Sequence, residues 1–388
     1  MQFIDLAAQQ KRIRSDLERR ILNVLDHGHY VLGPEIAELE ERLGDYVGVN
    51  HALACASGTD ALLMALMAYE IGPGDAVFTT PFSFFATAEV ISLLGATPVF
   101  VDIDESSFNI DPQMLEAAIQ DIVNNDRTHP VYRSMAPDET LVPKAIIAVD
   151  LFGLPANYPA INAISRKYGL TVIEDAAQSF GAEQNGQRAC SLADVACTSF
   201  YPAKPLGCYG DGGMCFTNDE KLSDILRSLR IHGMGEHQYD NVRVGINGRL
   251  DTIQAAVLLS KFDIFPEEVN FRNDAAIRYE KLLGGAANLK IPKVPDGARS
   301  AWAQYSLLAE SEAHKDNLRA RLNQDNIPTA VYYPKPLHLQ AVFEPLGYRK
   351  GDFHVSESSA QRIFSLPMHP YLDLRDQERI ADILLNAG

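Results

Sequence analysis

Short apolar runs alternate with segments of helical periodicity along most of this 388-residue chain. Nearly continuous apolar strands that are joined by helices are typical of a parallel sheet buried on both faces. The pattern therefore predicts an α/β fold in which helices cover a large, mostly parallel sheet. Strands are predicted at residues 51–54, 76–79, 97–101, 145–149, 170–174, 195–200 and 213–217, with helices at 60–69, 85–94, 158–168 and 220–229.

The alternation ends near Pro266. Before the first strand, residues 9–46 show helical periodicity that is interrupted by Gly33-Pro34. Two domains are therefore predicted, a large one at 1–264 and a smaller α+β domain at 265–388. The remaining elements are predicted as helices at 250–262, 271–283, 314–324 and 376–387 and a strand at 303–310, and the polar segment 124–142 as a surface excursion.

Charge and composition exclude several kinds of partner. The net charge of −17 disfavours binding to nucleic-acid backbones or to anionic membrane surfaces. An anionic substrate would need a local basic pocket. No apolar run reaches the roughly 18 to 20 residues of a membrane span, and the first residues do not form a signal peptide. The odd number of five cysteines, without a CxxC pair, indicates reduced thiols in a cytoplasmic protein, and the ten histidines lack metal-ligand spacing, so no metal is predicted.

Lys204 and Asp175 form the pair that most strongly indicates chemistry. Asp175 follows an apolar strand, and Lys204 lies in a tight turn that precedes the run Gly210-Asp211-Gly212-Gly213. Pyridoxal phosphate needs a lysine amine to form a Schiff base with its aldehyde and a carboxylate to keep its ring nitrogen protonated. A single lysine is usually a solvated surface charge, but the combination predicts a site for this cofactor.

The residues around this pair could complete such a site. Gly58 and Thr59 lie at the start of an apolar helix, where free N–H groups bind anions, although the same pattern also fits an ordinary helix cap. Ser199 could add a hydroxyl to the phosphate, and Gln178 could reach the ring hydroxyl. One of the three phenylalanines of the segment 81–87 could stack on the ring, but buried core is the usual place for phenylalanine.

Several ordered segments of the sequence resemble one known family. These segments extend from residues 3–6 to residues 365–370 and include 58–62, 174–178, 199–204, 210–213, 245–251 and 333–338. The chain resembles the DegT/DnrJ/EryC1/StrS family of pyridoxal-phosphate-dependent nucleotide-sugar aminotransferases. The resemblance implies the type I (aspartate aminotransferase) fold and a homodimer with active sites at the subunit interface.

The resemblance also implies roles for individual residues. It assigns Lys204 to the Schiff base and Asp175 to the ring nitrogen, and it places the phosphate on Gly58, Thr59 and Ser199. Phe84 would stack on the ring, where other members often carry Trp or Tyr. Asn247 would reach the cofactor phosphate of the neighbouring subunit, although a residue between glycines could simply form a turn.

Within the family, residues 194–200 and 205–213 are most similar to enzymes that aminate the 3-position of a UDP-2-acetamido-3-oxo-uronic acid, with L-glutamate as the expected donor. A sugar carboxylate suits the guanidinium of Arg249. Arg243, Lys335 and His338 are further candidates for the sugar or the diphosphate. Each of these charges could instead be solvated or structurally paired.

Three alternatives stay open at this point. The first is amination at the 4-position of a nucleotide-linked 4-keto-6-deoxy sugar. The second is a sugar dehydratase of the same fold, but such relatives replace the Schiff-base lysine with histidine, whereas this chain has Lys204. The third is a regulatory protein that binds pyridoxal phosphate without turnover. Such a protein would carry an added DNA-binding module, for which the resemblance leaves no room.

Overall fold

The centre of the molecule is a seven-stranded mixed sheet with strand order β1-β9-β8-β5-β4-β2-β3. The computed structural model describes residues 1–286 and 288–386. Only β9 runs antiparallel to its neighbours β1 and β8, while β8, β5, β4, β2 and β3 are mutually parallel. The strands are β1 (His51–Cys55), β2 (Asp75–Thr79), β3 (Thr97–Phe100), β4 (Val142–Val149), β5 (Thr171–Asp175), β8 (Val195–Ser199) and β9 (Gly213–Thr217).

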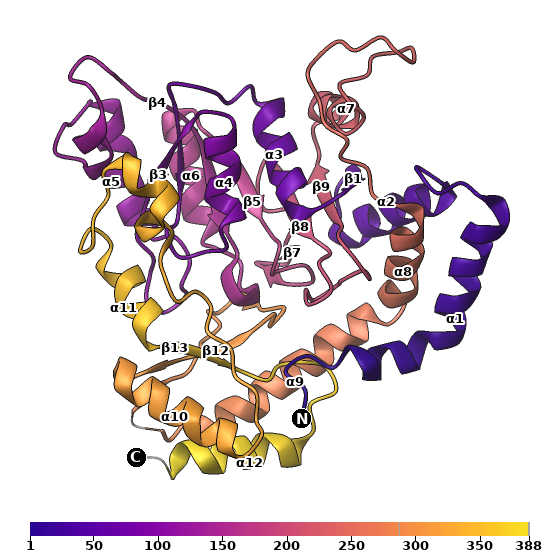
Figure 1. Cartoon of the computed structure of the whole chain (residues 1–388), viewed down its shortest axis with the longest axis vertical. Coiled ribbons are helices and arrows are strands. Elements are labelled where there is room, and N and C mark those ends of the chain that lie inside the picture. Colours follow the sequence, from indigo (N-terminus) through magenta and orange to yellow (C-terminus); the bar gives the residue numbers. More distant parts are fainter. Residues whose placement is uncertain (287, 387–388) are drawn as a thin grey trace.

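Helices cover both faces of this sheet (Figure 1). Successive strand residues point to opposite faces, so Leu53 and Cys55 pack under α3 (Gly58–Ala68), α4 (Ala86–Leu93) and α7 (Glu220–Leu229). Ala52 and Ala54 pack on the other face with α2 (Pro34–Val47) and α8 (Thr252–Phe262). Farther along that second face lie α5 (Pro112–Val123) and α6 (Tyr158–Tyr168). The predicted α/β class, with a mixed and mostly parallel sheet, is confirmed.

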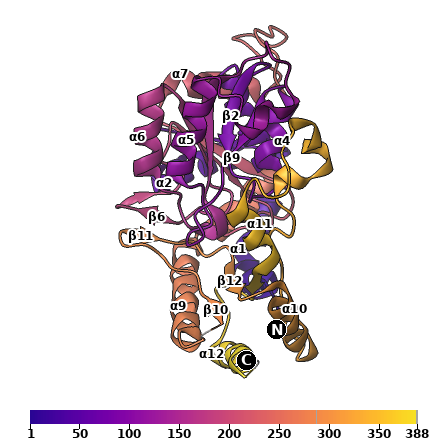
Figure 2. The ribbon, with the colours of Figure 1, turned by 90° about the vertical axis from the view of Figure 1, so that its left-hand side faces the viewer.

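The C-terminal part forms a second, smaller layer at the bottom of Figure 1, and Figure 2 shows it from the side. Its antiparallel sheet, in the order β10-β12-β13, packs against helices. The predicted boundary at residue 264 falls between α8 and α9. The elements here are α9 (Phe265–Leu283), β10 (Leu289–Lys290), β12 (Tyr305–Ala309), α10 (Glu312–Gln324), α11 (His354–Arg362), β13 (Ile363–Leu366) and α12 (Leu374–Leu385).

The remaining elements are the first helix and several short strands and turns. The long first helix, α1 (Leu6–His27), lies beside α8, as its buried residues Ile13 and Leu17 show by packing against Val257. The others are the strands β6 (Glu183–Gln184), β7 (Gln187–Arg188) and β11 (Ala298–Arg299), which form a small sheet, and the 3-10 turns η1 (Pro130–Ser134), η2 (Leu151–Gly153), η3 (Leu337–Leu339) and η4 (Ala341–Leu346). Among residues 1–286 and 288–386, the structure contains no helix with the length and apolarity needed to cross a membrane.

The segment 124–142 is mostly exposed, as the predicted surface excursion implies, but part of it enters the core. Its turn η1 buries Val131 and Tyr132 in the same core cluster as Phe343 and Tyr348. The Tyr348 hydroxyl also accepts a hydrogen bond from the N–H of Phe100 at the end of β3 (3.1 Å). The C-terminal part therefore returns to cover the edge of the large sheet, where it packs against apolar residues of an otherwise polar stretch.

Candidate active site at the carboxyl edge of the sheet

The predicted site residues gather where three strands end. Asp175 is the last residue of β5, Ser199 is the last residue of β8, and β1 leads directly into α3, which begins at Gly58. These strands run in the same direction, because β1 and β8 are both antiparallel to β9 and β8 is parallel to β5. Their carboxyl ends therefore lie along one edge, which is where open α/β sheets bind ligands.

The start of α3 lies against Ser199 and has the geometry of a candidate anion site. The Ser57 side chain caps the helix by accepting a hydrogen bond from the N–H of Asp60 (3.0 Å). The N–H groups of Gly58 and Thr59 have no intrahelical acceptor, since they belong to the first turn. A Cβ at Gly58 would lie 2.7 Å from the Ser199 Cβ, so only glycine allows this close approach. The Ser199 Oγ accepts a bond from the N–H of Tyr201 (3.2 Å), and its own proton remains available to an anion.

Asp175 is a buried carboxyl with few donors. Its side chain is 6% exposed. The Thr87 hydroxyl donates to Oδ2 (2.9 Å), and the N–H of Ala177 donates to Oδ1 (3.3 Å). Burial raises the pKa of Asp175, while these hydrogen bonds and the charge of Lys204 oppose the shift. A buried carboxylate with a cation nearby is suited to hold a second, ligand-borne cation.

Lys204 faces the same region from the turn that follows β8. The turn is closed by the N–H of Lys204, which donates to the carbonyl of Tyr201 (2.9 Å). Part of the Lys204 surface is accessible, yet enough protein surrounds the amine for burial to lower its pKa, against the opposing charge of Asp175. A lowered pKa increases the neutral, nucleophilic fraction of an amine.

The three phenylalanines of the segment 82–85 have different surroundings. Phe82 is fully buried, and Phe85 packs against Phe343. Phe84 is 58% exposed, so it is the one with a ring face open to a ligand. The structure therefore removes the core alternative for Phe84.

Gln178 is buried and engaged by the protein. Its Oε1 accepts from the N–H of Phe152 (2.8 Å), and its Nε2 donates to the Tyr333 hydroxyl (3.1 Å). Tyr333, whose pKa burial and the charge of Asp175 raise, is a site neighbour that sequence reasoning did not single out. Thr87 was missed in the same way, although it ends the aromatic segment that drew attention.

The four predicted substrate residues are not equivalent. Arg249 is partly exposed, and it makes no ion pair within the described parts of the chain. Nearby, the carbonyl of Gly248 accepts from the N–H of Ala56 (2.9 Å), which links this segment to the anion site. The substrate candidates Arg243 and Lys335 are exposed, as is Asn247, which was predicted to contact the cofactor phosphate of the neighbouring subunit.

His338 does not fit the role of a substrate contact. It is 1% exposed, its Nε2 lies 3.1 Å from the Glu357 carboxylate, and its ring packs on Phe353. A histidine that is buried in this way supports the return of the C-terminal segment to the large sheet. We therefore drop His338 from the substrate candidates.

Two further carboxyls are buried beside the site. Asp150, which follows β4, accepts from the Ser179 hydroxyl (2.6 Å) and from the Tyr158 hydroxyl (2.9 Å). Glu174 accepts from the N–H groups of Cys190 (2.6 Å) and Leu192 (3.0 Å). Burial raises the pKa of Asp150 to about 7, and burial together with the charge of Asp150 raises the pKa of Glu174 well above its usual range. Both carboxyls tie loops to the strand ends that carry Asp175.

This burial predicts a pH-dependent stability. The ordinary pKa of an aspartate is about 3.9, so between about pH 4 and pH 7 the folded protein binds more protons at Asp150 than the unfolded chain does. Stability from this group is therefore lost as the pH rises through that window. We expect Asp150→Asn to flatten the fall in melting temperature between pH values of about 5 and about 8. Asp45→Asn, at an exposed carboxylate on α2, should retain the slope, and equal slopes in both variants would contradict the assignment.

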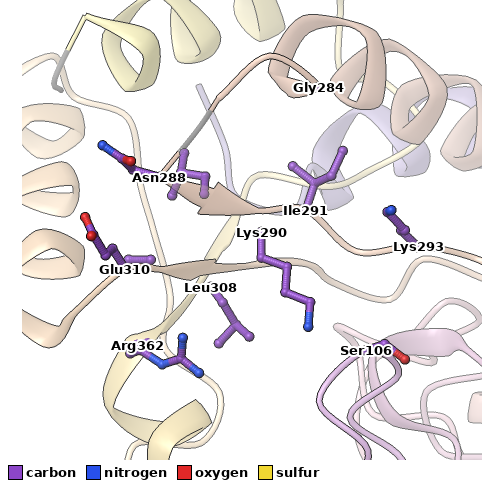
Figure 3. A pocket seen from close by; sticks show the side chains of 11 residues that line it. Ser106, Gly284, Asn288, Lys290, Ile291, Lys293, Leu308, Glu310 and Arg362 are labelled. Carbon is purple, nitrogen blue, oxygen red and sulfur yellow. The ribbon is translucent and has the colours of Figure 1, made fainter.

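A cavity away from these strand ends has a different character. It has a volume of about 620 Å³ and lies between β10 and the loop at Ser106 (Figure 3). Three cations line it, of which Lys290 and Arg362 pair with Glu105, at 3.0 and 2.6 Å. None of its lining residues belongs to the strand-end site, so we do not assign it to the chemistry.

The strand-end residues fit pyridoxal phosphate. The glycine-lined helix start and Ser199 suit a phosphate, because a Cβ at Gly58 would fill the space between them. Asp175 suits a protonated ring nitrogen, and Lys204 suits an aldehyde. Other phosphorylated ligands would use the anion site, but they would leave the buried Asp175 and the nearby Lys204 without a function.

Comparisons with known proteins agree with this chemistry. The model of the DegT/DnrJ/EryC1/StrS aminotransferase family matches residues 11–385. The chain is 46% identical to a UDP-2-acetamido-2-deoxy-3-oxo-D-glucuronate aminotransferase of Pseudomonas aeruginosa, over 100% of both chains. It is 39% identical to a UDP-N-acetyl-3-dehydro-alpha-D-glucosamine 3-aminotransferase of Acidithiobacillus ferrooxidans, over 98% of this chain and 96% of the relative. A crystal structure of a DegT DnrJ EryC1 StrS aminotransferase from Brucella abortus is 52% identical and superposes with a TM-score of 0.92, covering 99% of this chain and 98% of that one.

Proposed function

The chain belongs to the DegT/DnrJ/EryC1/StrS aminotransferase family, and we propose that it transfers an amino group from L-glutamate to carbon 3 of a UDP-linked 2-acetamido-3-oxo-hexuronate. As a member of this family it is a pyridoxal-phosphate-dependent nucleotide-sugar aminotransferase. The observation that carries the proposed substrate is the full-length identity of 46% with a relative named for this reaction. The proposed product is the corresponding 3-amino sugar.

The proposed chemistry divides among three groups of residues. When bound, pyridoxal phosphate accepts the amino group from the donor and withdraws electrons from the reacting carbon. Gly58, Thr59 and Ser199 would hold its phosphate, and Phe84 would cover the ring. Asp175 would hold a proton on the ring nitrogen. The Lys204 amine would bind the aldehyde and, when released, move a proton at the reacting carbon as base and then as acid.

Arg249 is the proposed contact for the sugar carboxylate. A guanidinium binds a carboxylate through two parallel hydrogen bonds. Arg249 lies two residues after the proposed phosphate contact Asn247 and is partly exposed. Arg243 and Lys335 are exposed cations that remain candidates for the diphosphate. These assignments supply the local positive charge that a substrate with both a diphosphate and a carboxylate needs on an acidic protein.

The substrate proposal is tested by offering two keto-sugars with L-glutamate. We expect amino transfer to UDP-2-acetamido-3-oxo-glucuronate and little to a nucleotide-linked 4-keto-6-deoxy sugar, with product detected by mass spectrometry. The reverse preference would support 4-amination instead. Turnover of neither sugar, with the cofactor bound, would contradict both proposals.

Arg249→Gln should separate carboxylate recognition from the rest of the site. Loss of one partner of a hydrogen-bonded charge pair costs about 2–5 kcal/mol, so kcat/KM for the uronate should fall by about thirtyfold or more. The corresponding 3-oxo sugar without the carboxylate should lose no more than a few-fold. Arg166→Gln, at an exposed arginine on α6, is the matched control. Equal losses for both sugars would assign Arg249 a structural role.

We also propose that the protein is a homodimer in which Asn247 contacts the phosphate of the neighbouring site. Exposed apolar residues support this proposal. Leu22 on α1 is 56% exposed, and Val31, in the link to α2, is 51% exposed. Isolated exposed apolar residues are common, but several on one helix and its link favour a covered face. A molar mass in solution of twice that of one chain would support the dimer, and a monomer would contradict it.

A further inference from the structure

The carboxylate of Asp175 is held by a chain of two buried hydroxyl groups. Thr87 Oγ1 lies 2.9 Å from Asp175 Oδ2 and also 2.9 Å from Ser83 Oγ. Thr87 is 1% exposed and Ser83 is 2% exposed. Protein groups therefore decide how both hydroxyls point.

The number of protons that each group can donate fixes the direction of these two hydrogen bonds. A hydroxyl has one proton to donate, and an ionised carboxylate can only accept. When Asp175 is ionised, Thr87 must give its proton to Oδ2. Ser83 must then donate to Thr87. The direction is Ser83 to Thr87 to Asp175, and each donation strengthens the next.

Helix α4 places the Thr87 hydroxyl within hydrogen-bonding distance of another strand. Thr87 is in the first turn of α4, which follows β2 at the carboxyl edge of the sheet. A threonine in a helix commonly bonds back to a carbonyl of the preceding turn. Here the hydroxyl instead crosses to the end of β5, 88 residues away. Among the hydrogen bonds to Asp175, that of Thr87 is the shorter, and it opposes the rise in the pKa that burial causes.

We propose that Thr87, supported by Ser83, is a positioning residue for amino transfer. It fixes the rotation of the Asp175 carboxylate and keeps it ionised, so that the carboxylate can hold the proton of a ring nitrogen. The inference rests on the role proposed above for Asp175. It adds two residues to the site that do not themselves contact substrate or cofactor.

The test compares variants that differ by one hydroxyl. Thr87→Val removes the hydroxyl and keeps the branched shape, whereas Thr87→Ser keeps the hydroxyl. Thr79→Val is the matched control, because Thr79 is also fully buried at the end of β2 but donates to the carbonyl of Ile147 (3.0 Å). Each variant is reconstituted with pyridoxal phosphate labelled with nitrogen-15 in the ring, and the ring resonance is recorded against pH.

We expect the ring resonance of Thr87→Val to move toward that of neutral pyridine, since a less stabilised carboxylate competes better for the shared proton. Its kcat should fall about tenfold or more, in line with a lost hydrogen bond to a charge, with a smaller change in KM. Thr87→Ser and Thr79→Val should match the parent in both measurements. An unchanged resonance in Thr87→Val, or failure of Thr87→Ser to restore it, would overturn the inference.

Two outcomes separate this inference from the proposed function. If Asp175→Asn is inactive while Thr87→Val matches Thr79→Val, only the positioning role fails. If Asp175→Asn is fully active, the role of Asp175 fails first. Should Thr87→Val not fold, Ser83→Ala replaces it, because removal of the donor to Thr87 must shift the resonance in the same direction by a smaller amount. The absence of such a shift would overturn the inference that Ser83 supports Thr87.

Discussion

Replacing Lys204 with alanine is expected to lower turnover by at least about a thousandfold, because it removes both the amine that binds the aldehyde and the proton carrier at the reacting carbon. The visible absorption band of the lysine-bound cofactor should be lost as well. Binding of the cofactor itself should survive in part, since the anion site at Gly58 and Ser199 is independent of Lys204. The measurements are single-turnover kinetics with L-glutamate and absorption spectra of the reconstituted variant.

A second lysine makes this test sharper. Lys261 is buried, burial lowers its pKa to about 8, and its Nζ donates to the carbonyl of Gly207 (2.6 Å). A lowered pKa alone would therefore nominate both amines as nucleophiles. Geometry separates the two lysines, because the Lys261 amine lies over the Tyr209 ring and is hydrogen-bonded to the backbone of the turn at Gly207.

Borohydride reduction distinguishes the two lysines directly. Hydride adds to the C=N bond that joins an amine to the cofactor aldehyde and fixes the cofactor on the peptide that carries it. We expect the mass increase on the peptide that contains Lys204. An increase on the Lys261 peptide, or undiminished turnover in Lys204→Ala, would contradict the assignment.

The elements that could be predicted are those with a strong local signal. The strand that carries Asp175 was visible because an apolar run ends at Glu174-Asp175, and the strand that carries Ser199 was predicted at 195–200, one residue beyond its observed end. The parallel order of these strands brings their ends together without further information. The core of the site was therefore accessible from sequence patterns and from the resemblance to a family.

What could not be predicted depends on contacts between distant parts of the chain. Thr87 was part of a segment noted for its aromatics, but its partner Asp175 lies 88 residues away. Tyr333 reaches Gln178 across 155 residues. Neither spacing leaves a periodic signal, because periodicity reports only how one element faces its core.

The burial of His338 was not visible from the sequence for a related reason. Its partner Glu357 and the ring of Phe353 lie on the following helix and loop, and the return of the chain to the large sheet decides its burial. The buried residues of segment 124–142 belong to the same packing, so both features have one physical origin.

Asp175→Asn is expected to reduce kcat by about a hundred- to a thousandfold, the usual cost of removing one preorganised electrostatic contact to developing charge. The amide has the same size, but it cannot hold a proton on the ring nitrogen as a carboxylate does. Thr87 Oγ1 can accept a hydrogen bond as well as donate one, so the fold should accommodate the change. Asp150→Asn, at the neighbouring strand end, is the matched control and should stay within a few-fold of the parent.

Stability provides the second half of this prediction. Burial raises the pKa of Asp175, which means that its ionised form is destabilised in the folded protein above the ordinary pKa of about 3.9. The neutral amide is free of this penalty. The cofactor-free Asp175→Asn variant should therefore melt at the same temperature as the parent or higher at neutral pH, while its turnover collapses. If the melting temperature and the activity both fall, Asp175 supports the fold. If the melting temperature is kept or rises while the activity falls, the Asp175 charge is retained at the expense of stability because the reaction requires it.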